Sequence, residues 1–141
     1  MKAKNSVVVV EDDAVLRGLL VDTLDETGCD VRTAVDSGEA LALLATWTPD
    51  VILLDFRLPG RDGYQLRQEQ RRRRLAPNAR VLVMSAESEG ARIAARLDDA
   101  FMAKPFELQE LVRIVRELTE PKRRAAPDSP PSSGYVSSRV R

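Results

Sequence analysis

The sequence has 141 residues, of which 43% are hydrophobic and 31% are charged, as is ordinary for a soluble globular domain with a tail. No apolar run reaches the roughly 18 residues that a membrane-spanning helix needs. The basic start leads into only four valines, which are too few for the apolar core of a signal peptide. We therefore expect a cytoplasmic protein that does not enter a membrane.

The formal net charge of zero conceals two regions of opposite sign. Residues 1–120 contain 17 Lys and Arg against 21 Asp and Glu, whereas residues 121–141 contain five basic residues and one acid. The sequence has no histidine, which excludes Ser-His and Cys-His nucleophile pairs, imidazole bases and His-ligated zinc. Its single cysteine, Cys29, excludes an internal disulfide. Any chemistry must therefore rest on carboxylates, hydroxyls, lysine or a metal.

Apolar, β-rich runs alternate five times with helical patterns. In chain order, we predict strand Ser6–Val10, helix from Asp13 to Gly28, strand Asp30–Ala34, helix from Ser37 to before Pro49, strand Val51–Leu54, helix Tyr64–Leu75, strand Val81–Met84, helix Ser88–Leu97, strand Ala100–Ala103 and helix Phe106–Glu120. In the first helix the apolar residues at helical spacing are Val15, Leu16, Leu19, Leu20 and Leu24. The alternation predicts an α/β fold with a doubly wound, five-stranded parallel sheet and five helices.

The last segment, residues 121–141, is rich in Pro, Ser, Ala and Arg. Such a composition cannot bury enough apolar surface to offset the entropy of ordering. We predict one domain over residues 1–120, followed by a disordered basic tail or linker. Because the segment after the last helix is short, we also expect no DNA-binding domain in it.

Acids, a hydroxyl and a lysine stand at the carboxyl ends of the predicted strands. Glu11 and Asp12 follow the first strand, Asp55 the third, Ser85 the fourth and Lys104 the fifth. Because ligands of open α/β sheets bind at this edge, we expect these side chains to share one pocket. Crowded carboxylates favour a hard cation such as Mg²⁺, and the lysine and hydroxyl suit a phosphoryl group. An Asp in this setting can form an aspartyl phosphate.

Four segments resemble the receiver domain of two-component response regulators. They are VVVVEDD at 7–13, VILLDFRLPGRDG at 51–63, VLVMSA at 81–86 and FMAKPF at 101–106. They occur in the order of the family, near its spacing, and the match covers roughly residues 5–119. Four such segments, each at a strand end, are far more specific than one. The resemblance implies a flavodoxin-like fold and a single-domain regulator similar to the chemotaxis regulators.

The resemblance implies that Asp55 accepts a phosphoryl group from a phosphohistidine on a sensor histidine kinase or histidine phosphotransfer protein. Asp12 would bind Mg²⁺ directly and Glu11 through water. Asp55 itself and the backbone carbonyl of Arg57 would complete the metal site. The protein would then be a phosphorylation-dependent signalling switch in a two-component phosphorelay, with no enzymatic activity beyond its own phosphorylation and dephosphorylation.

The same resemblance implies that Ser85 and Lys104 bind phosphate oxygens once Asp55 is phosphorylated. Phe101 would be a switch aromatic that turns inward when the hydroxyl moves, although plain core packing explains a buried Phe equally well. The Lys104-Pro105 bond would be cis. Output would pass to an unknown downstream protein, with a homodimer as one form of the phosphorylated state.

Two other functions are considered. The chain could be the receiver module of a larger hybrid kinase or regulator, with the tail as a linker. It could also be a Mg²⁺-dependent phosphatase that uses an aspartyl phosphate. However, such enzymes resembling haloacid dehalogenases place a second Asp two residues after the nucleophile, where this sequence has Arg57.

Some features depart from the family or need no function. The interval from Ser85 to Lys104 is 19 positions, nearly one helical turn shorter than in most receivers, and the loss falls in the fourth helix. The run Arg71–Arg74 suits the negative end of a helix dipole, and an interaction patch for an acidic partner is the alternative. Asp62, Asp98 and Asp99 are interpreted as caps and loop residues.

Overall fold

The structure is a computed structural model that describes residues 4–60 and 62–120. In this part of the chain the strands are β1 (Ser6–Val10), β2 (Asp30–Ala34), β3 (Val51–Asp55), β4 (Arg80–Ser85) and β5 (Ala100–Ala103). The helices are α1 (Ala14–Glu26), α2 (Ser37–Leu44), α3 (Gly63–Arg72), α4 (Ser88–Arg96) and α5 (Leu108–Thr119). Every predicted element is present, with shifts of a few residues at the helix ends. Helix α3 ends before Leu75 because Arg74 has a φ of 57°, which an α-helix does not allow.

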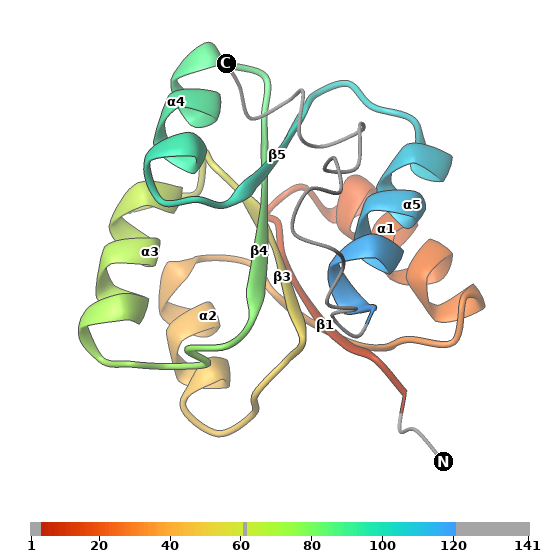
Figure 1. The fold of residues 1–141 in the computed structure, drawn as a ribbon, viewed down its shortest axis with the longest axis horizontal. Coiled ribbons are helices and arrows are strands. Elements are labelled where there is room, and N and C mark those ends of the chain that lie inside the picture. The colour runs from red at the N-terminus through yellow and green to blue at the C-terminus, as the bar shows by residue number, and fades with distance from the viewer. Residues whose placement is uncertain (1–3, 61, 121–141) are drawn as a thin grey trace, which may run out of the picture.

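The five strands form one parallel sheet in the order β2-β1-β3-β4-β5. The chain runs from β1 outward to β2, and then crosses to β3 on the other side of β1. Helices cover both faces of the sheet, with α1 and α5 on one face and α2, α3 and α4 on the other (Figure 1). This is the doubly wound, flavodoxin-like fold that the sequence predicts.

Side chains of each strand alternate between two hydrophobic cores. Val7 and Val9 pack with residues of α1 and α5, whereas Val8 and Val10 pack with residues of α2 and with neighbouring strands. Both sets are fully buried. The central strands are therefore continuous apolar runs, because neither of their faces meets water.

Helix α1 begins at a side-chain cap and packs through only part of its apolar surface. The carboxylate of Asp13 accepts hydrogen bonds from the backbone N–H groups of Val15 and Leu16, as predicted for an N-cap. Leu20 and Leu24 are buried. However, Val15 and Leu19 are 75% and 47% exposed, so two of the five apolar residues at helical spacing lie outside the core.

The structure bears on the predicted membrane and tail properties only within the described residues. No helix in the described ranges is long and apolar enough to cross a membrane. The predicted tail, residues 121–141, lies outside the described residues, so its disorder and the domain boundary at 120 stay predictions, as does the cytoplasmic location.

A buried ion pair joins α3 to the loop before β5. Arg67 donates from Nε and Nη2 to the two carboxylate oxygens of Asp99, both at 2.7 Å, and Nη1 donates to Gln70 at 2.9 Å. Both side chains are almost excluded from water. Asp99 therefore lies in a loop, as interpreted, and its carboxylate is in addition the buried ion-pair partner of Arg67.

Removing the carboxylate of Asp99 tests this buried pair. We expect Asp99→Ala to lower the free energy of unfolding by about 3–5 kcal/mol, because Arg67 is left charged without its partner in the interior. Glu110→Ala, which breaks the exposed pair with Arg113, is the control and should cost less than about 1 kcal/mol. Urea denaturation followed by circular dichroism measures both. Equal losses in the two variants would contradict the assignment of a structural role to Asp99.

Candidate functional site

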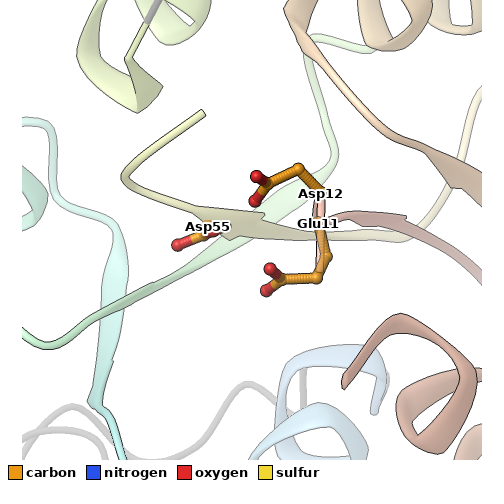
Figure 2. Close-up of side chains that lie close together, drawn as sticks. All are labelled: Glu11, Asp12 and Asp55. Atoms are coloured by element: carbon orange, nitrogen blue, oxygen red, sulfur yellow. The ribbon is translucent and has the colours of Figure 1, made fainter. Parts of the chain in front are cut away.

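The site lies where β1 and β3 end side by side. The order of the strands reverses between these two strands, and open α/β sheets bind their ligands at such a switch point. Glu11 and Asp12 follow β1, and Asp55 is the last residue of β3 (Figure 2). Parallel strands bring their carboxyl ends to the same edge, which is why acids 43 positions apart in sequence become neighbours.

Three carboxylates converge at this edge. One oxygen from each of Glu11, Asp12 and Asp55 lies within 4.8 Å of the others, which is a spacing that can hold a metal ion. Glu11 and Asp55 are buried, at 1% and 5% exposure, while Asp12 is exposed. The group combines two desolvated acids with one that meets water, so an ion could enter from the side of Asp12.

Lys104 connects the two buried acids. Its Nζ atom lies 3.2 Å from Glu11 Oε1 and 3.2 Å from Asp55 Oδ1. Burial lowers the pKa of Lys104, but the carboxylates of Asp55 and Glu11 outweigh that effect and raise the pKa above its usual value. Lys104 is therefore a fixed positive charge at neutral pH. The Lys104-Pro105 bond is cis, as the resemblance implies.

The acids also affect one another. Burial raises the pKa of Glu11, and the nearby carboxylate of Asp55 raises it further. The backbone N–H of Asp13, which donates to Glu11 Oε2 at 3.1 Å, and the ammonium of Lys104 oppose this rise. Because the pKa of Glu11 stays raised, one lysine does not fully offset the crowding of negative charge, and the site favours a further cation.

The two carboxylate oxygens of Asp55 differ in their surroundings. Oδ1 accepts from Lys104 and, at 3.4 Å, from the backbone N–H of Arg57. Oδ2 accepts no hydrogen bond from any described residue. Asp55 as a whole is 5% exposed. The two oxygens of this buried carboxylate therefore differ in their hydrogen bonds to the described chain.

Ser85 ends β4 and is tied to the loop that follows it. Its Oγ atom accepts a hydrogen bond from the backbone N–H of Glu87 at 2.9 Å and donates to the carbonyl of Glu87 at 3.3 Å. The carboxylate of Glu87 in turn accepts from Nε and Nη2 of Arg57 at 3.1 and 2.8 Å. The loops after β3 and β4 are thus joined next to Asp55, and the Arg57 side chain is directed to Glu87.

Phe101 is 6% exposed and belongs to the core cluster on the side of α2, α3 and α4. Gly90, in the first turn of α4, lies between it and Ser85. A Cβ atom built on Gly90 would come within 2.6 Å of Ser85 Cβ and 3.4 Å of the Phe101 ring. Phe101 is therefore already packed inward in this structure, and a movement of its ring on phosphorylation stays a prediction.

The sequence predicts the acids, the hydroxyl and the lysine of the site, but not three residues that contact them or lie beside them. Glu87 and Gly90 carry no motif that marks them, because their contacts with Arg57 and Ser85 depend on how α4 packs against the sheet. A third residue that the sequence does not mark is Arg17. Its guanidinium donates to the backbone carbonyl of Glu11 at 3.0 Å and so holds the backbone after β1 in place.

The comparison with known families decides the class of this fold and site. The sequence profile of the response regulator receiver domain matches residues 7–116. The chain belongs to the response regulator receiver domain family. The family acts in phosphorylation-dependent two-component signalling, in which Mg²⁺ and a phosphoaspartate are typical. The match gives no support to the alternative of an aspartyl-phosphate phosphatase.

Individual relatives agree with the family. The chain is 38% identical over 110 residues to the DNA-binding transcriptional regulator NtrC of Salmonella typhimurium, covering 76% of this chain and 23% of NtrC. It is 35% identical over 130 residues to the response regulator MprA of Mycobacterium sp. (strain KMS), covering 90% of this chain and 54% of MprA. The receiver domain of the Francisella response regulator 1452 has a TM-score of 0.71 at 31% identity, covering 82% of this chain and 97% of that one. The chain thus spans 23% of the length of NtrC and 54% of the length of MprA.

The close approach of α4 to Ser85 predicts opposite effects of alanine at two helical glycines. Gly90→Ala should lower the free energy of unfolding by about 1–3 kcal/mol, because the Ser85 Cβ atom cannot move aside without shifting backbone. Gly18→Ala, on an exposed face of α1 with nothing near the added carbon, should raise it by about 0.5–1 kcal/mol. Urea denaturation measures both, and a stabilising Gly90→Ala would contradict the packing described here.

Proposed function

We propose that this domain is a phosphoacceptor switch in which Asp55 takes a phosphoryl group from a phosphohistidine of a partner protein. The observation that supports this most directly is the asymmetry of the Asp55 carboxylate. Oδ1 accepts hydrogen bonds from Lys104 and from the backbone N–H of Arg57, whereas Oδ2 accepts none from any described residue and is the oxygen proposed to attack. These 141 residues contain no histidine, so the phosphohistidine lies outside this sequence.

The donor set fits a magnesium ion. Glu11, Asp12 and Asp55 offer carboxylate oxygens within 4.8 Å of one another, and Mg²⁺ prefers one or two carboxylates together with water and phosphate oxygens. Asp12 and Asp55 would bind the ion directly, Glu11 through water, and the backbone carbonyl of Arg57 would complete the set. The ion would supply positive charge for the oxygens of the transferred phosphoryl group.

The chain's own residues carry the rest of the transfer. Asp55 Oδ2 attacks phosphorus, the P–N bond to the donor imidazole breaks, and its electron pair returns to the ring nitrogen, which takes up a proton from solvent. Lys104 is already within 3.2 Å of Asp55, so its ammonium pairs with a phosphoryl oxygen without a large movement. If Lys104 turns from Glu11 to the phosphoryl group, Glu11 keeps its second hydrogen bond, which the backbone N–H of Asp13 donates to its Oε2 atom.

Ser85 would couple the phosphoryl group to the rest of the molecule. Its hydroxyl now donates to the carbonyl of Glu87, so donation to a phosphate oxygen requires that this contact be given up. Because Gly90 lies against Ser85, a movement of the Ser85 side chain would change the packing of the first turn of α4. We infer that α4, joined to Arg57 through Glu87, is the element whose position reports phosphorylation.

Partner contacts follow from the same geometry. Val15 and Leu19 lie four residues apart on α1, are exposed, and follow the acidic loop closely. A donor protein that brings its phosphohistidine to Asp55 would cover this apolar surface, whether it is a sensor histidine kinase or a phosphotransfer protein. The downstream protein is not specified by the site. A homodimer of the phosphorylated form is a further expectation, which gel filtration with and without beryllofluoride decides.

Phosphorylation by a small donor tests the proposal. Incubation with acetyl phosphate and Mg²⁺ should add one phosphoryl group, observed by intact-mass measurement. EDTA should abolish the adduct, because the carboxylates then lack the ion that offsets their charge. Asp55→Asn should also abolish it, because the amide is not a nucleophile for this reaction.

Asp22→Asn is the matched control, since it removes an exposed carboxylate on α1 away from the acidic cluster. It should be phosphorylated like the unchanged protein. An adduct that persists in Asp55→Asn would reject Asp55 as the acceptor, and an adduct that forms equally in EDTA would reject the metal requirement.

A further inference from the structure

A second concave site lies far from the acids, at the carboxyl end of α3. It is a cavity of about 670 Å³ lined by residues of α3, of the loop before β4 and of the end of α4, namely Arg67, Gln70, Arg71, Arg72, Arg74, Leu75, Pro77, Ala79 and Leu97. Since α3 begins beside the acceptor loop and β4 begins after this cavity, the two sites lie at opposite edges of the sheet. Its volume is within the range of small-molecule sites.

Positive charge predominates at the rim of the cavity. Glu69 pairs with Arg72 and Arg73, and hydrogen bonds from these two guanidinium groups hold its pKa at about 2. Arg71 and Arg74 make no ion pair with any described residue. Both are exposed. Glu69 thus pairs with two arginines and Asp99 with Arg67, whereas Arg71 and Arg74 form no ion pair among the described residues, although the charge of Arg71 opposes the rise that burial causes in the pKa of Asp99.

The floor of the cavity is built from groups that cannot move freely. Arg67 is held by Asp99 in a buried bidentate pair. Gln70 is also buried; it accepts from Arg67 and donates to the backbone carbonyls of Leu75 and Ala76 at 3.0 and 3.4 Å. These bonds tie α3, the following loop and the start of β5 together. The rim arginines Arg71 and Arg74 thus stand on a rigid base, which reduces the cost of ordering them around a ligand.

Unusual backbone conformations surround the same cavity. Among the described residues, the non-glycine residues with positive φ are Arg74 (57°), Ala76 (45°) and Asp98 (59°). Arg74 lines the cavity, Ala76 lies between the lining residues Leu75 and Pro77, and Asp98 follows Leu97. Left-handed conformations disfavour residues with a Cβ atom, and helices usually end with glycine there. The residue in this conformation at the end of α3 is Arg74, whose side chain lines the cavity. A strained backbone thus coincides here with a charged side chain.

From these observations we propose that the cavity binds a small molecule bearing two or more linked phosphates, such as a nucleoside diphosphate or inorganic pyrophosphate. Guanidinium groups bind phosphate oxygens in a planar, bidentate way. The carbonyls at the end of α3 oppose an anion, but they act within one turn and are outweighed by the arginines beside them. Leu75, Pro77, Ala79 and Leu97 provide an apolar wall for a nucleoside, whereas a single phosphate would leave most of the volume unfilled.

Isothermal titration calorimetry tests this site with pyrophosphate, adenosine diphosphate and adenosine, in EDTA so that the acidic cluster holds no metal. The two phosphate compounds should bind and adenosine should not. Raising the salt from about 50 to 300 mM should weaken binding, since the rim is exposed. Tighter binding of adenosine diphosphate than of pyrophosphate identifies a nucleotide as the source, and equal binding identifies the linked phosphates alone; both outcomes support the site.

The variants locate the binding. Arg71→Gln combined with Arg74→Gln should raise the dissociation constant of pyrophosphate at least about tenfold. Arg92→Gln is the control, because Arg92 is an exposed arginine on α4 outside the cavity lining, and it should leave the constant within about twofold. Binding should persist in Asp55→Asn. Thermal melting checks that each variant is folded.

Three results would overturn the proposal. One is the absence of measurable heat from pyrophosphate at concentrations up to about 10 mM, which corresponds to almost no affinity. Another is an equal loss of binding in Arg92→Gln, which would show only a diffuse effect of charge. The third is binding of polyglutamate through Arg71 and Arg74 while both phosphate compounds fail, which would assign the cavity to an acidic protein partner instead.

Discussion

The crowding of three carboxylates around one lysine is the interaction on which the site depends. Glu11 and Asp55 are buried, and desolvation makes their charges costly unless a cation is near. Lys104 meets both at 3.2 Å, yet the pKa of Glu11 stays raised. With three carboxylates and one ammonium, the cluster is two positive charges short of balance, which is the electrostatic condition in which a divalent ion is favourable.

The parallel sheet is what assembles this cluster from distant segments. The order β2-β1-β3-β4-β5 places β1 beside β3, and the short turns after these strands deliver acids at the same edge. Two apolar cores hold the strands in register. The positions of Asp55 and Lys104 therefore follow from the packing of apolar side chains and not from contacts among polar residues. The basic cavity at the other edge is attached to the same frame through the Arg67–Asp99 pair.

Fold and acceptor cluster could be predicted because both depend on local patterns. Buried strands are continuous apolar runs, and an acid or lysine directly after such a run must lie at the sheet edge. The partners of Arg67, Ser85 and Gly90 could not be predicted, because they depend on how α3 and α4 approach the sheet. The exposure of Val15 has the same cause: helical spacing predicts which residues share a face, whereas the neighbouring elements decide how much of that face is covered.

The central claim is that Asp55, and no other acid of the cluster, carries the phosphoryl group. Reduction of the acetyl-phosphate-treated protein with borohydride converts an acyl phosphate to an alcohol, and peptide mass mapping then identifies the residue. We predict homoserine at position 55, with Glu11 and Asp12 unchanged, because Lys104 and the N–H of Asp13 occupy the Glu11 oxygens and because Lys104 pairs with Asp55 but not with Asp12. Reduction at Glu11 or Asp12 with Asp55 intact would contradict the account.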